Sequence, residues 1–73
     1  MSFKLKDPSR RIYLCRIEKN LSRQYLADCL NVTERTIGNW ESGKTALNIT
    51  QINKVAEVLE VSPLHLVDVP SLD

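Results

Sequence analysis

The sequence predicts an all-α fold, a five-helix domain that contains a helix-turn-helix. No segment of useful length alternates polar and apolar residues as a strand does, and helix stop signals recur about every ten to fifteen residues between segments of helical period. The segment Leu21–Lys44 predicts two short helices joined by a tight corner. These observations fix the expected class, and each helix can then be placed from its caps.

The first helix is expected to be capped by Asp7, to begin at Pro8 and to end near Lys19. Asp7 is a good N-cap residue, and Pro8 suits the first helical position because its ring fixes a helical φ and its missing N–H has no partner there. Asn20 can take the left-handed conformation that ends a helix.

The next two helices are short. Ser22 caps the second, which is expected to stop near Leu30, with Asn31 turning the chain. Thr33 caps the third, which is expected to reach about position 42 and to end at Gly43.

The fourth helix is predicted by a capping box, and the fifth by a second cap signature. Asn48 is followed three residues later by Gln51, the pattern in which both residues satisfy each other's backbone N–H. Ser62 and Pro63 start a short fifth helix to about Val67. The fourth helix carries an apolar stripe expected to be mostly core: Ile49, Ile52, Val55, Ala56 and Leu59.

Length and composition predict one small domain. With 73 residues and 42% apolar content, the chain is near the lower size at which one core suffices. We expect an N-terminal arm over 1–7, the domain over 8–68 and a C-terminal tail over 69–73. No signal peptide or membrane span is recognisable, so a cytoplasmic protein that does not contact a membrane is expected.

The net charge is only +1, but the charge is unevenly distributed. Residues 1–23 contain seven Lys or Arg and two acidic residues, whereas residues 45–73 contain one Lys and four acidic residues. A basic first part and an acidic last part suit a protein that offers one surface to phosphates, although this signal alone carries little weight.

The sequence gives no support for a metal site, a cofactor or an enzyme. Cys15 and Cys29 are far apart, and the single histidine, His65, is distant from both. No Ser/His/Asp or Cys/His set has usable spacing, and the two glycines form no phosphate-binding loop. No metal, cofactor or catalytic residue is therefore expected.

An internal ion pair is predicted from helical angles. With 100° per residue, Ile37 and Trp40 share the inner face of the third helix, and Glu41 lies about 40° from Ile37. A carboxylate on that side is costly unless it is paired, and Arg16 raises the same problem on the inner face of the first helix. We therefore expect a buried or half-buried pair between Arg16 and Glu41.

With these residues in place, the chain resembles the XRE-type helix-turn-helix family, which includes phage repressors and Cro-like proteins. The resemblance extends without gaps from about Ile12 to Val67 and implies the same Arg16–Glu41 pair. The family also includes restriction-modification controllers and Cro-like phage switch proteins, which a chain of this size resembles more than a two-domain repressor. The positions that carry the resemblance are Leu21, Ser22, Leu26, Ala27, Val32, Thr33, Thr36, Ile37, Glu41, Ser42, Gly43, Lys44, Ala56, Leu59, Val61, Ser62 and Leu66.

The chain also departs from the family pattern. Arg23 stands where a glutamine usually opens the second helix, and Asn20 and Asn31 replace customary glycines. Glu60 occupies another such position and would be strained if the backbone is left-handed there. Gly38, inside the third helix, is compatible either with a close approach to DNA or with simple tolerance.

The resemblance implies a DNA-binding transcriptional regulator whose third helix enters the major groove. Arg35 and Asn39 point away from Ile37 and are the expected base readers, with Glu34 and Thr36 as further candidates; Glu34 is equally explained as a helix-dipole residue. Phosphate contacts are expected near the helix ends, from Ser22, Arg23, Thr33, Ser42, Lys44 and Thr45.

We expect a homodimer on double-stranded DNA half-sites, with no small-molecule ligand. The best interface candidates are Leu64, Val67 and Val69. Leu14 and Ile17 form a second apolar patch, covered either by the N-terminal arm or by a partner protein. The alternative function is a protein-interaction module, such as an antitoxin or an anti-repressor target, that uses the same fold.

Overall fold

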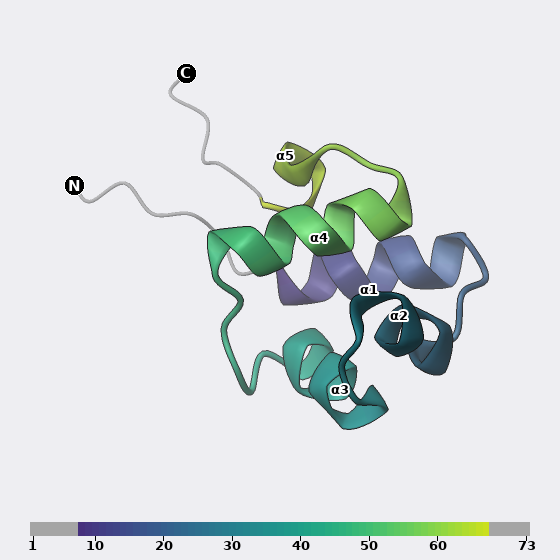
Figure 1. Cartoon of the computed structure of the whole chain (residues 1–73). Coiled ribbons are helices and arrows are strands. Elements are labelled where there is room, and N and C mark those ends of the chain that lie inside the picture. Colours follow the sequence, from purple (N-terminus) through teal and green to yellow (C-terminus); the bar gives the residue numbers. More distant parts are fainter. Residues whose placement is uncertain (1–7, 68–73) are drawn as a thin grey trace, which may run out of the picture.

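The computed structural model describes residues 8–67, which form five helices and no strand (Figure 1). Helix α4 packs on α1 and runs in a similar direction in this view, and α2 and α3 lie together on one side of this pair (Figure 1). The predicted all-α, five-helix fold is confirmed. The helices are α1 (Ser9–Glu18), α2 (Arg23–Leu30), α3 (Glu34–Ser42), α4 (Ile49–Leu59) and α5 (Pro63–Leu66).

Side-chain caps start the helices from α2 onward as the sequence predicts. The Ser22 hydroxyl accepts from the backbone N–H of Tyr25 at 3.0 Å, and the Thr33 hydroxyl accepts from Thr36 at 3.2 Å. Asn48 and Gln51 form the complete capping box of α4. These bonds satisfy N–H groups that have no partner inside the helix, so they fix where each helix begins.

The start of α1 differs from the prediction. Pro8 is the N-cap residue, with φ −74° and ψ −6°, and the helix begins at Ser9 rather than at Pro8. The carbonyl of Pro8 accepts the first helical bond, from Ile12 N–H at 2.9 Å. Asp7, the expected cap, lies outside the described residues.

Between residues 8 and 67, four residues with a left-handed backbone end helices or turn the chain. Asn20, Asn31 and Glu60 each have φ of 58°, and Gly43 has φ of 78°. The turns at Asn20, Asn31 and Gly43 are as expected. Glu60 has the left-handed backbone that was given as the condition for strain at this position. A side chain with a Cβ costs about 1–2 kcal/mol in this conformation unless it is Asn or Asp.

Replacing Glu60 with glycine should therefore stabilise the protein. We expect the free energy of unfolding of Glu60→Gly to rise by about 1 kcal/mol, because glycine removes the Cβ clash at the end of α4. Urea unfolding monitored by circular dichroism measures this change. Asn31→Gly is the matched control and should gain less, since asparagine already tolerates the left-handed conformation; equal gains for both variants would contradict the explanation.

The core is formed by one apolar face from each helix. The side chains without solvent exposure include Ile12 from α1, Leu26 from α2, Ile37 from α3, Leu59 from α4 and Leu66 from α5. Ala27 of α2 is also fully buried. This core holds α3 by its inner side only and leaves its other side at the surface.

Ile49 is a correction to the predicted apolar stripe of α4. Ile52, Val55, Ala56 and Leu59 are buried as expected, but Ile49 is 66% exposed. Ile49 is the first residue of α4, and its side chain is left at the surface at this end of the helix. The buried stripe therefore begins one turn later than the sequence pattern suggests.

Candidate nucleic-acid interface

Helices α2 and α3 form a rigid corner that presents α3 at the surface (Figure 1). Residues 31–33 join them: Asn31 turns the chain, and the N–H of Val32 donates to the carbonyl of Ala27 at 3.0 Å. This bond to α2 closes the corner, and Thr33 then caps α3. The angle between the two helices is thus set by the sequence of the turn.

The outer side of α3 contains the four residues expected to contact bases. Ile37 and Trp40 are buried and anchor the helix, at 0% and 5% exposure. Glu34 and Arg35 are exposed in the first turn, whereas Asn39 and Thr36 are partly buried. The candidate base readers therefore lie on a single helix, and Arg35 has the most freedom to extend into a groove.

Three hydroxyl groups at the ends of α3 already have partners within the chain. The hydroxyls of Thr33 and Thr36 lie 2.9 Å apart, and that of Ser42 donates to the carbonyl of Asn39 at 3.2 Å. The same carbonyl accepts from the N–H of Lys44 at 2.9 Å. These hydrogen bonds order both ends of α3, so the hydroxyls would meet DNA from a fixed position.

Arg16 and Glu41 form the ion pair that helical angles predicted. Arg16 Nε donates to Glu41 Oε2 at 2.5 Å and its Nη2 to Oε1 at 3.1 Å, while Nη1 donates to the carbonyl of Leu21 at 2.8 Å. The side chains of Arg16 and Glu41 are only 8% and 2% exposed. The hydrogen bond to Glu41 raises the pKa of Arg16, so this guanidinium stays charged.

Arg23 joins this pair from α2, which the sequence did not reveal. Its Nε donates to Glu41 Oε1 at 3.1 Å, so one carboxylate holds guanidinium groups from α1 and α2. We call Arg16, Glu41 and Arg23 the Glu41 bridge. Because the bridge joins α1, the start of α2 and α3, it fixes α3 against the rest of the domain.

The Arg23 guanidinium lies against Gly38. A Cβ built on Gly38 would meet Nη1 of Arg23 at 3.6 Å, which is ordinary van der Waals contact. The Arg23 side chain is still 46% exposed, and only its Nε is bound to Glu41. The expected phosphate contact is thus compatible with the bridge, because the outer edge of the guanidinium remains at the surface beside α3.

Gly38→Ala should stabilise the isolated protein. The added methyl group fits beside Arg23, and alanine favours a helix interior over glycine by about 1 kcal/mol. We expect the free energy of unfolding to rise by about this amount in urea titration. The affinity for DNA then separates the two explanations of the glycine: unchanged affinity means that it is only tolerated, and a loss means that DNA approaches the helix backbone there. A destabilised variant would show that Arg23 cannot accommodate the methyl group.

The expected phosphate-binding residues lie at the two ends of the corner. The first N–H groups of α2 and α3 have no partner within their own helices, as at any helix start. The exposed residues beside the helix ends are Ser22, Arg23, Thr33, Ser42, Lys44 and Thr45. This distribution suits a DNA backbone that passes both ends of α3.

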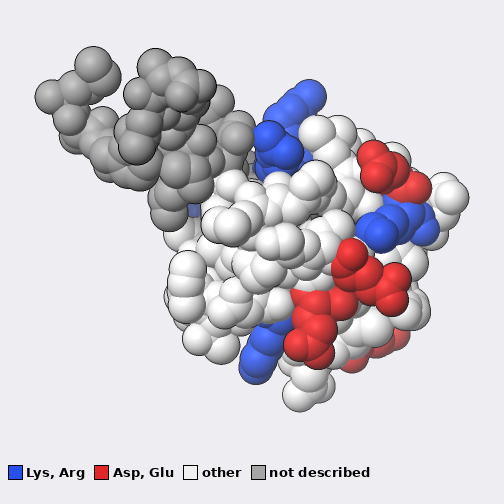
Figure 2. All heavy atoms as spheres, turned by 90° about the horizontal axis from the view of Figure 1, so that it is seen from above, with Lys and Arg blue, Asp and Glu red and all other residues white. Residues whose placement is uncertain are grey.

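The side of the molecule away from α3 has a different character. Seen from above, over α4 and α5, acidic side chains gather along one edge, separate Lys and Arg side chains lie beside and apart from them, and much of the remaining surface is uncharged (Figure 2). The described part of this face therefore presents no continuous basic patch to phosphates.

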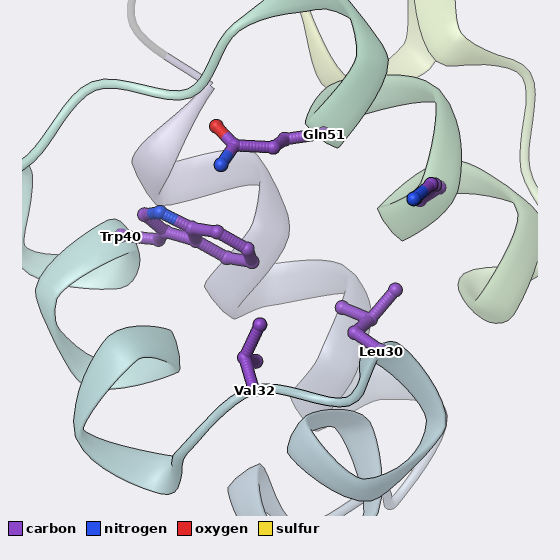
Figure 3. A pocket seen from close by; sticks show the side chains of 5 residues that line it. Leu30, Val32, Trp40 and Gln51 are labelled. Atoms are coloured by element: carbon purple, nitrogen blue, oxygen red, sulfur yellow. The ribbon is translucent and has the colours of Figure 1, made fainter.

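A small hollow lies behind α3, between the α2–α3 turn and α4 (Figure 3). Its volume is about 140 Å³, and its lining consists of Leu30, Val32, Trp40, Gln51 and Lys54. The Gln51 side chain points toward the Trp40 ring (Figure 3), and its Oε1 is already bound in the capping box. The hollow therefore lies where α4 faces the buried side of α3.

The residues expected at a dimer interface differ in how far they are exposed. Leu64 is 72% exposed on α5, whereas Val67 is half-buried against the core. Val69 lies outside the described residues. Within the described part of the chain, no three His, Cys, Asp or Glu side chains gather as metal ligands, and no helix has the length and apolarity needed to cross a membrane.

Comparison with known proteins agrees with this geometry. A helix-turn-helix family model, HTH_3, matches residues 12–66. A curated relative, the SPbeta prophage-derived uncharacterized HTH-type transcriptional regulator YonR of Bacillus subtilis, is 35% identical over 52 residues. The match covers 71% of this chain and 48% of that relative, so the chain spans about half of its length.

Solved structures show the same fold. The restriction-modification controller protein C.AhdI from Aeromonas hydrophila superposes with a TM-score of 0.77 at 27% identity, covering 82% of this chain and 91% of that one. SinR, a master regulator for biofilm formation crystallised with DNA, gives 0.73 at 32% identity, covering 81% and 95%. Since the family model spans most of the chain, including the whole corner and the core behind it, the protein is a member of the HTH_3 helix-turn-helix family.

Proposed function

We propose that the protein is a sequence-specific regulator of transcription that binds double-stranded DNA through α3. The observation that carries this proposal is the corner itself: α3 is anchored by Ile37, Trp40 and the Glu41 bridge, and its polar outer side is exposed. Such an arrangement places side chains against base edges in the major groove. The relatives named as transcriptional regulators and the DNA complex of SinR support the same function.

We assign base contacts and phosphate contacts from the position of each residue. Arg35 suits guanine O6 and N7, Asn39 suits adenine N6 and N7, and Glu34 and Thr36 are secondary base contacts. The phosphates on either side would be held by Ser22, Thr33, Ser42, Lys44, Thr45 and the outer edge of Arg23.

Selection of bound duplexes from a random pool tests this function. We expect enrichment of one half-site that appears twice in inverted orientation, with centres about one helical turn apart. Binding to random duplex should weaken steeply as salt rises, because phosphate contacts release counterions. A pool without enrichment, together with no salt-dependent binding, would exclude a DNA-binding role.

We further propose that the functional form is a homodimer through α5. One copy covers too little DNA for strong selection, and Leu64 leaves a large apolar side chain at the surface of α5. Sedimentation should show a dimer at micromolar concentration, and Leu64→Glu should shift the protein to monomer. Because Leu64 is mostly exposed, this variant should keep its circular dichroism spectrum. A wild-type monomer at these concentrations contradicts the assignment.

A second candidate function is a protein-interaction module, such as an antitoxin. It is favoured by the net charge of only +1 and by the exposed apolar residues Tyr13, Leu14 and Ile17 on α1. A salt-dependent mobility shift on random DNA discriminates the two functions. The basic groups around the corner favour DNA, and we place this candidate second.

A further inference from the structure

Helix α1 has apolar residues on its outer side as well as on its buried side. Ile12 and Cys15 face the core, where α1 packs on α3, α4 and α5. On the outer side, Tyr13, Leu14 and Ile17 are 41%, 47% and 48% exposed. None of the helices in the described part of the chain covers this side, so three adjacent apolar residues remain at the surface.

The charges beside these residues are arranged symmetrically. Arg10 lies four residues before Leu14 and Glu18 four residues after it, and all three are exposed. Residues four apart follow one row along a helix. Neither Arg10 nor Glu18 has an ion pair with another described residue. The row Arg10–Leu14–Glu18 thus has a positive end, an apolar centre and a negative end.

We propose that the outer face of α1 is a contact surface for a second copy of this chain, with the two α1 helices antiparallel. A two-fold axis beside Leu14 would bring Arg10 next to the partner's Glu18, and Glu18 next to the partner's Arg10. Each charge lies about 6 Å along the helix from Leu14, at 1.5 Å per residue, so both ion pairs form in the same register. The row is therefore complementary to itself, as a two-fold interface requires.

The neighbouring residues support the same packing. Tyr13 and Ile17 are also four apart and form a parallel row next to Arg10–Leu14–Glu18. Two helices pack when a row of one fits between two rows of the other. The Leu14 row of one copy would enter the groove between the Leu14 and Tyr13 rows of its partner, which buries the apolar residues and leaves the ion pairs at the ends.

This surface is separate from the dimer that we propose through α5. One helix face per copy is smaller than a standard stable interface, so the contact is weak for free molecules. It gains strength where two copies are held close together, for example at neighbouring sites on one DNA molecule. The α1 surface would then join molecules side by side, whereas α5 would join the two halves of one dimer.

The test uses sedimentation equilibrium of the full chain without DNA. The parent is Leu64→Glu, which removes the α5 contact and should leave the exposed α1 surface intact. We expect this parent to self-associate reversibly at about 0.5 mM, as befits a small interface. A strictly monomeric parent at this concentration overturns the proposal.

Charge reversals then test the pairing. Arg10→Glu and Glu18→Arg, each in the parent, should weaken association at least tenfold, because like charges meet at both ends. The double exchange Arg10→Glu/Glu18→Arg should restore it, and so should an equimolar mixture of the two single variants. Equal association of all variants, or a mixture no stronger than its components, overturns the antiparallel register.

A matched control separates this contact from general charge effects. Lys54→Glu also changes the net charge by two units, but on α4, and should leave association unchanged. A loss equal to that of Arg10→Glu would show that net charge alone is responsible. Since no DNA is present, the outcome is independent of the proposed function: a protein that binds no DNA can still associate through α1, and the reverse also holds.

Discussion

Removing Glu41 is expected to destabilise the protein by about 3 kcal/mol. The carboxylate is 2% exposed and holds two guanidinium groups, so Glu41→Ala leaves Arg16 charged and nearly buried without its main partner. We place the loss at the lower end of the range for such a deletion, because Arg16 keeps its bond to the carbonyl of Leu21. Urea unfolding measures this loss as the difference in the free energy of unfolding between the variant and the wild type. The comparison requires that both proteins show the same slope of the free energy against urea concentration.

The loss of Arg16 and the loss of Glu41 should reduce the free energy of unfolding by different amounts. Arg16→Met should cost less than Glu41→Ala, because Glu41 then still accepts from Arg23. In the double variant Arg16→Met/Glu41→Met, apolar side chains replace the pair, and the stability should return to within about 1 kcal/mol of the wild type. Arg23 is about half exposed and can be solvated when its partner is gone.

The control for this series is Glu57→Ala, an exposed glutamate on α4. It should change the free energy of unfolding by less than about 0.5 kcal/mol. If Glu41→Ala and Glu57→Ala lose the same amount, the Glu41 bridge does not stabilise the fold. If the losses of the single variants Arg16→Met and Glu41→Met simply add in the double variant Arg16→Met/Glu41→Met, the two side chains are not coupled.

Local signals were sufficient to predict most of the helix boundaries. Ser22, Thr33 and Asn48 cap helices through bonds that depend only on residues three positions away, so the sequence reveals them directly. The left-handed turns at Asn31 and Gly43 are local in the same sense. The start of α1 was misplaced by one residue because Pro8 is acceptable both before and at the first helical position.

Contacts between distant residues were only partly predictable. Arg16 and Glu41 could be paired because each was a charged residue on an inner face, and two such residues need each other. Arg23 gave no such signal: it is at the surface, and its position beside Gly38 depends on how closely α2 approaches α3. The prediction that Ile49 is buried was wrong, because helical periodicity gives the face on which a residue lies but not whether another element covers that face.

The Glu41 bridge connects folding to the proposed reading of DNA. Its carboxylate comes from α3, and its two arginines come from α1 and from the first position of α2. A phosphate held by the outer edge of Arg23 would thus be coupled through Glu41 to the helix that bears Arg35 and Asn39. In this arrangement a backbone contact also sets the position of the base readers, as expected when phosphate contacts fix the register of a protein on DNA.

Arg35→Ala should weaken binding to the selected half-site by about 1–3 kcal/mol, or about 5- to 150-fold, and relax the preference at one base pair. Arg35 is exposed in the first turn of α3 and points away from the buried Ile37. Lys44→Ala, just beyond the same helix, should instead weaken binding to all DNA sequences alike. It should also lower the slope of log K against log salt concentration by about one unit. Fluorescence anisotropy with selected and random duplexes over a salt series measures both effects.

Lys54→Ala on α4 is the control for the loss of one positive charge outside the expected phosphate-binding residues, and it should change neither preference nor salt dependence appreciably. The three variants separate base reading from phosphate attraction because they remove the same charge from three places. If Arg35→Ala lost as much affinity for random duplex as for the selected site, Arg35 would be a phosphate contact, and sequence reading would have to come from Asn39 and its neighbours on α3.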